Sequence, residues 1–484
     1  MAQSSLFSRI LNKLQKGLTP SVTLSRAYHK AGNSKGKIYN LFQKIVPLGD
    51  PATRLGTVID QWVSDGKKVT DSLLLLTIKG LRARRRYAHA LEVSEWMSCK
   101  WSRKFSSSDH AIQMDLIGRV RGLESAEAYF ASLNDQDKDD KTYGALLHCY
   151  CKDGHVDKAL SLLHKMKELG YASTYLVYKD LMSLYINAGQ PEKVPKVFME
   201  MKKNGISPDN FSYRMYLSSF GERCDLDDVK KIVEEMESDT IFSMDWVTCC
   251  TVANIYIKAG SADLALVYLK KCEEKIDKEA IGYNHLISLY ASLGNKDEVM
   301  RVWSLAKSKC KNQNNRDYIT MLGSLVKLDD LEEATKLLSE WESTCHFHDF
   351  RVPNVLVIGY AQKGQVEKAE ALLREVISKG KTPIPNSWAI VASGYVGKQN
   401  MEAAYRCMKE ALDVHAENKG WKPKPQLISR IFDWLSANGD TEQVQSFVTQ
   451  LKTKLPEIGK VYDPLLEEYL RSRKEADGLA ASST

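Results

Sequence analysis

The densest group of side chains that could do chemistry is a basic stretch near the start of the chain. Between residues 81 and 105 only Glu92 and Glu95 oppose seven bases, which are Arg82, Arg84, Arg85, Arg86, Lys100, Arg103 and Lys104. Trp101 and Phe105 stand among the last of these bases. Cationic groups bind phosphates and aromatic rings stack on bases, so the stretch is a candidate contact for nucleic acid. A charge run is as often a solvated surface, and the sequence leaves both interpretations open.

Two other groups resemble known site chemistries but lack a necessary part. Residues 345–349 (CHFHD) contain metal-ligand types, yet a zinc site there would need a further ligand from a distant part of the chain. Residues 380–382 (GKT) match the end of a phosphate-binding loop, whose leading glycine is replaced by Glu375. We therefore interpret both as ordinary loop residues, and we expect no metal and no cofactor.

The overall composition indicates a folded protein without a membrane span. Hydrophobic residues make up 43% of the 484 residues and charged residues 27%. The longest runs of branched aliphatic residues, 73–76 and 355–358, are far shorter than the roughly 18 residues of a membrane helix. Ten cysteines include no Cys-x-x-Cys pair, as expected for core thiols in a reducing compartment.

The N-terminal segment differs from the rest in charge. Eight bases and no acid stand in the first 49 residues, so the formal net charge of +7 leaves −1 for the remainder. Within residues 1–30, apolar residues recur at helical spacing, at Phe7, Ile10, Leu11, Leu14 and Leu18. An acid-free amphipathic segment of this kind predicts a mitochondrial transit peptide and a location in the matrix. Arg26 fits a processing site that would leave a mature chain beginning near His29.

An internal repeat organises the rest of the chain. Its first aromatic or equivalent position recurs at intervals of 34 to 36 residues, at Tyr143, Tyr178, Tyr213, Cys249, Tyr283, Tyr318, Pro353 and Trp388. Looser copies centre on Leu74, near Ala111 and on Ile428, which predicts about ten or eleven repeats. We call these positions the anchors of the repeats.

Three further columns predict that each repeat is a helical hairpin. Seven residues after the anchor stands an aromatic residue in most repeats, two helical turns on and so on the same face. Eleven residues after it stands a glycine that can end a helix in the left-handed conformation, at Gly154, Gly189, Gly260, Gly294, Gly364 and Gly439. Sixteen residues after it stands alanine or valine, which lets two helices pack closely. One hairpin cannot bury its apolar face alone, so the fold is expected to be a stack.

The expected organisation has four parts. Residues 1–30 form the transit peptide, residues 31–70 an N-terminal cap, and residues 71–455 the repeat array. Residues 456–484 contain a predicted last helix over 462–474 and then a disordered tail of small residues.

The tails of the repeats carry a family resemblance. Residues 166–170 read MKELG, residues 201–209 read MKKNGISPD, and residues 283–290 open a repeat with YNHLISLY. This combination resembles the pentatricopeptide repeat family, and within it the P-type members of plant organelles. The resemblance covers residues 71–455. It implies a right-handed α-solenoid that binds single-stranded RNA in its concave groove, one base per repeat.

The resemblance also implies which residues read bases: the residue after each anchor together with the last residue of the repeat. The implied pairs are Gly144 with Thr174, Lys179 with Asp209, Arg214 with Asp245, Cys250 with Glu279, Asn284 with Asn314, Ile319 with Asp349, and Asn354 with Ile384. Asn284 with Asn314 fits the family pattern and Asn354 fits half of it. Lys179 and Arg214 are better suited to phosphate. We therefore expect a poor reader of base sequence that holds RNA by its backbone.

The expected function is non-catalytic. The deaminase extension found in the family requires Pro-Cys-x-x-Cys for zinc, and that pattern is absent. The first hypothesis is a mitochondrial RNA-binding factor in organellar RNA processing, stability or translation. The second is a structural subunit of the mitochondrial ribosome that contacts ribosomal RNA and ribosomal proteins. The third is a protein-protein scaffold.

Deleting residues 1–30 is expected to abolish import, because this segment holds the acid-free amphipathic pattern. The measurement is uptake of radiolabelled full-length and truncated chains by isolated mitochondria, scored by protection from added protease. Protection of the truncated chain would contradict the predicted location.

Overall fold

The computed structural model describes residues 41–50, 53–101, 104–221, 226–310, 312–345, 349–414 and 421–482, with side chains described as far as residue 473. Within these ranges the secondary structure is helical and includes no strand, which confirms the predicted fold class. The helices there include none that is both long and apolar enough to cross a membrane. The chain divides into two compact units, Met1–Arg223 and Cys224–Thr484.

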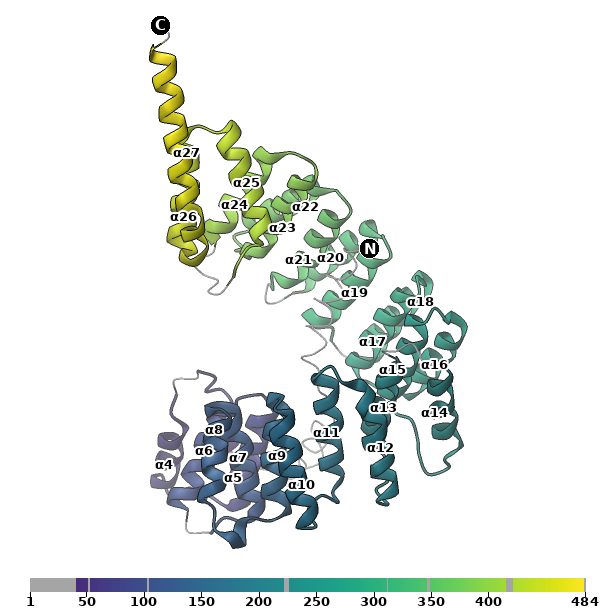
Figure 1. The fold of residues 1–484 in the computed structure, drawn as a ribbon. Helices are drawn as coiled ribbons and strands as arrows, with labels where there is room; N and C mark the ends of the chain where they lie inside the picture. The colour runs from purple at the N-terminus through teal and green to yellow at the C-terminus, as the bar shows by residue number, and fades with distance from the viewer. Residues whose placement is uncertain are drawn as a thin grey trace. The chain divides into compact units, whose positions relative to one another are not determined.

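The described part of the first unit starts with two short helices, α3 (Leu41–Ile45) and α4 (Leu55–Ser64), which pack on the first hairpin. The hairpins follow in chain order: α5 (Asp71–Ala83) with α6 (Tyr87–Lys100), α7 (Ser107–Arg121) with α8 (Leu123–Ser132), α9 (Asp140–Asp153) with α10 (Val156–Glu168), and α11 (Tyr175–Asn187) with α12 (Val194–Lys203). The last helix of this unit is α13 (Asn210–Gly221). The first helices of successive hairpins, α7, α9, α11 and α13, pack on one another in turn (Figure 1).

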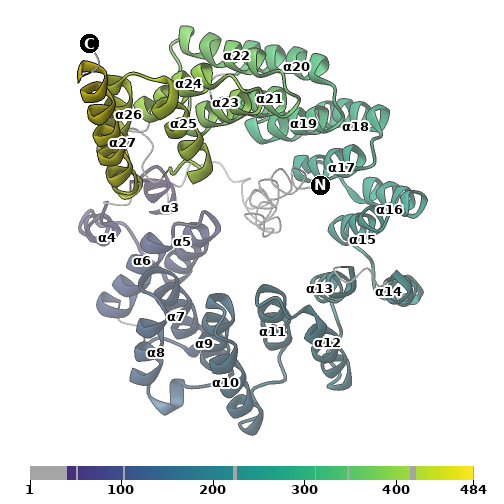
Figure 2. The ribbon, with the colours of Figure 1, turned by 45° about the horizontal axis from the view of Figure 1, so that its top comes forward.

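The second unit begins with α14 (Leu226–Ser238) and continues with six hairpins. These are α15 (Trp246–Lys258) with α16 (Ala262–Lys275), α17 (Ala280–Ser292) with α18 (Lys296–Lys309), α19 (Asn315–Lys327) with α20 (Leu331–Thr344), α21 (Arg351–Gln362) with α22 (Val366–Ser378), α23 (Pro385–Gly397) with α24 (Met401–Val414), and α25 (Pro425–Asn438) with α26 (Thr441–Lys454). Figure 2 shows the hairpins from α17 to α24 lying side by side. Along the described chain, α5 to α26 make eleven consecutive pairs, in agreement with the predicted number of repeats.

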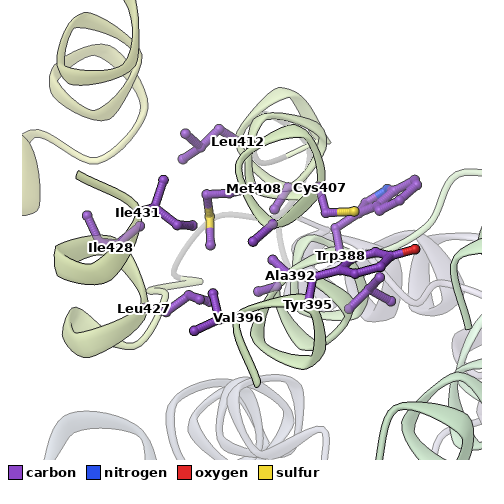
Figure 3. Packing of buried hydrophobic residues seen from close by; sticks show 14 of the residues in the cluster. Trp388, Ala392, Tyr395, Val396, Cys407, Met408, Leu412, Leu427, Ile428 and Ile431 are labelled. Atoms are coloured by element: carbon purple, nitrogen blue, oxygen red, sulfur yellow. The ribbon is translucent and has the colours of Figure 1, made fainter. Parts of the chain in front are cut away.

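The core of ten of the eleven pairs, all except α7 with α8, contains the small residue predicted sixteen positions after the anchor. The side chains in this column are all fully buried, at Ala90, Ala159, Val194, Val229, Ala265, Val299, Ala334, Ala369, Ala404 and Val444. Figure 3 shows part of the core of the second unit, where Trp388 of α23 lies beside Cys407 of α24 and Met408 of α24 points toward Ile431 of α25. Burial of such apolar side chains contributes about 25 cal/mol per Å² removed from water. The columns read from the sequence therefore form the core.

The first helix of most hairpins ends in a left-handed residue eleven positions after the anchor. Five of the six predicted glycines have φ between 69° and 79°, namely Gly154, Gly189, Gly260, Gly294 and Gly364. Gly439 does not, because it continues in an extended conformation with φ −84° and leads directly into Asp440, which caps α26. The same left-handed position is occupied without glycine by Arg85, Asp329 and Gln399, with φ of 58°, 64° and 61°. Their Cβ atoms carry a strain that glycine avoids.

The C-terminal helix is longer than predicted. The helix α27 spans Pro456–Ser482, whereas the sequence predicted a helix over 462–474 and a disordered tail. Tyr462 and Tyr469 are buried, and the helix packs on α26, so it covers the last hairpin. Its later residues include alanine and leucine, which favour helix and allow it to continue.

Replacing Gln399 with glycine is expected to stabilise the protein by about 1 kcal/mol, because it removes the left-handed strain at an exposed position. The matched control is Gly364→Ala in the preceding repeat, where an added Cβ meets no atom within 4 Å and only the positive φ opposes it. That change is expected to destabilise by about the same amount. Urea unfolding followed by circular dichroism measures both, and shifts of the same sign would contradict the strain argument.

Candidate RNA-binding surface

In some repeats the last residue caps the first helix of the next repeat through its side chain. Asp209 precedes α13, and its Oδ1 accepts hydrogen bonds from the backbone N–H and the hydroxyl of Ser212, both at 2.9 Å. Asp245 caps α15 in the same way through Thr248, with both distances at 2.7 Å. A cap of this kind stabilises a helix by about 1 kcal/mol. The positions implied to read bases therefore have a structural task.

Three of these last residues also bind the side chain at the beginning of their own repeat. The links join Tyr175 to Asp209 at 2.7 Å, Trp246 to Glu279 at 3.0 Å, and Asn315 to Asp349 at 3.3 Å. Burial raises the pKa of Asp209, but hydrogen bonds from Ser212 and Tyr175 outweigh burial and hold that pKa below its ordinary value. The carboxylate is therefore ionised at neutral pH and already has donors.

The asparagines that fit the family pattern are also bound within the protein. Asn284 is buried and donates from Nδ2 to Oδ1 of Asp317 at 2.6 Å. The backbone N–H of Asn314 donates to Oδ2 of the same carboxylate at 2.9 Å. Asn354 accepts a hydrogen bond from the hydroxyl of Ser387 at 2.5 Å. Each asparagine thus contacts the following hairpin through part of its hydrogen-bonding capacity.

The other implied readers have little to offer a base edge. Gly144 has no side chain, and Ile319 has an apolar one. Cys250 is buried, and its sulfur lies 2.9 Å from the sulfur of Cys272 on the second helix of the same hairpin. This hydrogen bond and burial raise the pKa of the Cys250 thiol well above its ordinary value. None of these three positions provides an amide or a carboxylate for a base edge.

Lys179 and Arg214 lie together on one aromatic ring. The Nζ atom of Lys179 on α11 is 4.8 Å from the ring centroid of Phe211, and Cζ of Arg214 is 6.0 Å from the same centroid. Phe211 is the second residue of α13 and is half-buried, and within the described residues Lys179 has no ion pair. We call Lys179, Phe211 and Arg214 the Phe211 cluster. Two cations beside an aromatic ring suit a phosphate and a stacked base.

Two arginines of the basic stretch, Arg84 and Arg86, contact the segment from Phe42 to Leu48. Arg86 donates hydrogen bonds to three backbone carbonyl oxygens there, those of Ile45, Val46 and Leu48. Arg84 lies 5.1 Å above the ring of Phe42, and Arg85 occupies the left-handed position that ends α5. Because Arg86 is committed to these carbonyls, we leave it outside the proposed RNA contact.

The second half of the stretch is partly engaged. Lys100 forms an ion pair with Asp60 at 2.7 Å, while Lys104 is exposed and has no ion pair within the described residues. Arg103 lies outside the described residues. The indole of Trp101 donates to Asp71, and Phe105 is buried against His110 at 5.4 Å between ring centroids. The indole N–H of Trp101 and the buried ring of Phe105 are thus both engaged within the protein.

Arg82 belongs to a polar chain that crosses four first helices. It binds the buried carboxylate of Asp115 at 2.7 Å, and Nε of Arg119 binds the same carboxylate at 2.7 Å. Nη2 of Arg119 is 3.2 Å from Nε2 of His148, whose Nδ1 is 3.1 Å from Asp180. The hydrogen bond to Asp180 raises the pKa of His148, although burial opposes it. The chain therefore joins α5, α7, α9 and α11.

Sequence reasoning missed most of this chain and the ring of the Phe211 cluster. Arg119 stands between Gly118 and Val120, and Phe211 stands between Asn210 and Ser212, so neither belongs to a charge run. A signal was nevertheless present, because Arg82 and Arg119 both lie eight residues after the anchor positions Leu74 and Ala111. Matching columns across repeats would have brought them together.

The described residues contain no group of three or more His, Cys, Asp or Glu side chains that could hold a metal ion. The two histidines of residues 345–349 fall outside those residues.

Family models match the repeats directly. The model described as PPR repeat matches residues 141–171, 281–310, 317–343 and 352–380, and the model described as PPR repeat family matches residues 175–222. These ranges coincide with the hairpins of both units.

Three relatives from Arabidopsis thaliana match almost the whole chain. One mitochondrial pentatricopeptide repeat-containing protein is 43% identical over 92% of this chain and 90% of its own length. A second is 34% identical over 88% of this chain and 86% of its own length. The large ribosomal subunit protein mL101 (rPPR4) is 34% identical over 90% of this chain and 89% of its own length.

Solved structures show the same fold. The crystal structure of the pentatricopeptide repeat protein PPR10 from maize superposes with a TM-score of 0.53 at 17% identity, covering 83% of this chain and 61% of that chain. PPR10 in complex with an 18-nt psaJ RNA element gives a TM-score of 0.53 at 18% identity, covering 83% and 58%.

The stacked hairpins of about 35 residues define an α-solenoid of the helical-repeat class. The chain belongs to the pentatricopeptide repeat family. Relatives that carry mitochondrial in their names support the mitochondrial location that residues 1–30 predict.

Replacing Asp209 with alanine is expected to lower stability by about 1 kcal/mol through loss of the cap on α13. Asp209→Asn is the matched control, because asparagine also caps well. If the residue only caps, neither variant changes the relative affinities for homopolymeric RNAs, measured by fluorescence anisotropy. A changed base preference in Asp209→Asn, with stability kept, would show that Asp209 reads a base.

Proposed function

We propose that this protein is a non-catalytic RNA-binding protein of the mitochondrial matrix that holds single-stranded RNA by phosphate and stacking contacts. The Phe211 cluster carries the proposal, because it combines two cations with one half-buried ring at the junction of two hairpins. Stacking of a base on an aromatic side chain contributes about 1–3 kcal/mol without selecting the base.

The engagement of the base-reading positions favours weak sequence selectivity. Asn284 and Asp209 are bound to neighbouring side chains, and Cys250 is buried beside Cys272. A base that replaced these partners would have to compensate a buried polar group for each bond lost. Contacts to the RNA phosphate backbone have no such cost, and they position the RNA without selecting its base sequence.

The cellular role that follows is in organellar RNA processing, stability or translation. PPR10, whose fold this chain shares, was crystallised with an RNA element. The near-neutral charge of the body restricts RNA attraction to local patches such as the Phe211 cluster. Long RNAs are therefore expected to bind at several weak positions along one face.

A structural subunit of the mitochondrial ribosome is the second candidate. The relative named large ribosomal subunit protein mL101 supports it, since it is 34% identical over 437 residues. Weak base reading agrees with this role too, because ribosomal RNA can be held through shape and backbone. Sedimentation of tagged protein from mitochondrial lysate separates the two: ribosome co-migration supports the subunit, and light RNase-sensitive particles support the free factor.

Replacing both Lys179 and Arg214 with alanine is expected to weaken binding of poly(U), poly(A) and poly(C) 18-mers by similar factors. The slope of log affinity against log salt should fall in magnitude by about 1.4, because each phosphate contact on a single strand contributes about 0.7. Anisotropy titrations between low and physiological salt measure both quantities.

The matched control replaces Lys167 and Lys271, which lie on second helices and pair with Glu200 and Glu237. This double alanine variant should bind like the wild type. If the Lys179 and Arg214 double variant lost affinity strongly for one homopolymer and not for the others, binding through the RNA backbone would be contradicted.

A further inference from the structure

A small basic cavity lies where the first hairpin meets the second. Its volume is about 280 Å³, and it is lined by Lys79, Arg82, Ala83, Tyr87 and Arg119. Three of these five residues are cations, and they come from the ends of α5 and α7. The cavity is therefore built by two hairpins of the same unit.

Asp115 fixes the two arginines at the wall. It accepts one hydrogen bond from Nη2 of Arg82 and one from Nε of Arg119, both at 2.7 Å. Within the described residues, Nη1 of each arginine donates no hydrogen bond, and Lys79 is exposed without an ion pair. Three cations and one carboxylate leave a formal charge of +2 with donors to spare. Pre-oriented guanidinium groups lose little freedom when they bind an anion.

The part of the wall formed by Tyr87 adds to the positive potential of the cavity. Tyr87 is the first residue of α6, whose N-terminus has no side-chain cap, so a positive helix end lies at the cavity. The guanidinium of Arg119 also lies 4.9 Å over the ring of Tyr87, which adds a second contact that holds it in place.

We propose that this cavity binds a phosphomonoester, and that its ligand is the 5′-terminal phosphate of the bound RNA strand. A phosphomonoester carries close to two negative charges at neutral pH, which matches the charge of the cavity, whereas an internal phosphodiester carries one. Arginine forks bind such oxygens in pairs, and Lys79 adds a point charge at the rim. The assignment of RNA as the source rests on the proposed function.

The test compares two RNAs that differ only at the 5′ end. A 12-nucleotide oligouridylate with a 3′ fluorophore is prepared with a 5′-phosphate and with a 5′-hydroxyl, and anisotropy gives both affinities for the full chain. Wild-type protein is expected to bind the phosphorylated RNA about tenfold more tightly. Equal affinities for the two RNAs would overturn the proposal.

Two variants test whether the preference for 5′-phosphorylated RNA arises at the cavity. Lys79→Ala removes an exposed cation without touching Asp115 and is expected to lower the preference about threefold. Arg119→Gln is expected to abolish it while leaving the affinity for 5′-hydroxyl RNA unchanged, with circular dichroism confirming the fold. Lys158→Ala, on α10 and paired with Glu127, is the control that keeps the preference. A preference retained in both cavity variants would contradict the assignment.

Titration calorimetry with 5′-UMP and uridine separates the two sources of the phosphate group. Weaker binding of 5′-UMP than of phosphorylated RNA supports the RNA end, whereas equal or tighter binding would overturn the RNA assignment in favour of a free nucleotide.

The Lys179 and Arg214 double variant separates this proposal from the proposed function. If both hold, this variant binds both RNAs more weakly but still prefers the one with a 5′-phosphate. Failure of all RNA binding, with 5′-UMP still bound at the cavity, would refute the proposed function and retain the phosphate site.

Discussion

The fold depends on close contact between the two helices of each hairpin. In ten of the eleven pairs that contact is made at a small side chain sixteen residues after the anchor, and these ten residues, from Ala90 to Val444, are all buried. A larger residue there would separate the helices and expose the aromatic column beside it. Because one hairpin buries only part of its apolar surface, the rest must be covered by a neighbour, and the two short helices α3 and α4 and the long helix α27 cover the outermost hairpins.

The junctions between hairpins have competing structural and binding roles. Asp209 and Asp245 end one repeat and cap the next, and Asn284 binds a carboxylate of the following hairpin. These bonds stabilise the stack, but they use hydrogen-bonding groups that a base reader would need free. Cations such as Lys179 do not have this conflict, since phosphate can be added without breaking a bond inside the protein. The chemistry of the junctions thus favours the RNA backbone over the bases.

The repeating columns predicted the hairpins because each column reflects a local requirement that recurs in every repeat, and the left-handed glycines such as Gly154 follow from it. The exceptions were not predictable in this way. Arg85 occupies the glycine position with φ 58°, and Gly439 is extended because Asp440, the next residue, already caps α26. The sites were harder. A run of arginines looks alike whether Arg86 binds backbone carbonyls or a ligand, and the cavity arises only when helices of two repeats meet.

The bonds between the first and last side chains of a repeat have an evolutionary consequence. Trp246 and Glu279 are 33 residues apart, whereas Tyr175 and Asp209 are 34 apart, and both pairs still meet. The tail between the second helix of a repeat and the next repeat absorbs this difference. The tail after α16 is short, because α16 continues to Lys275 and α17 begins at Ala280. Whole hairpins can therefore be gained by duplication or lost by deletion, and small insertions can persist in the tails. An insertion of one residue inside a helix would instead turn the first and last side chains of that repeat away from each other.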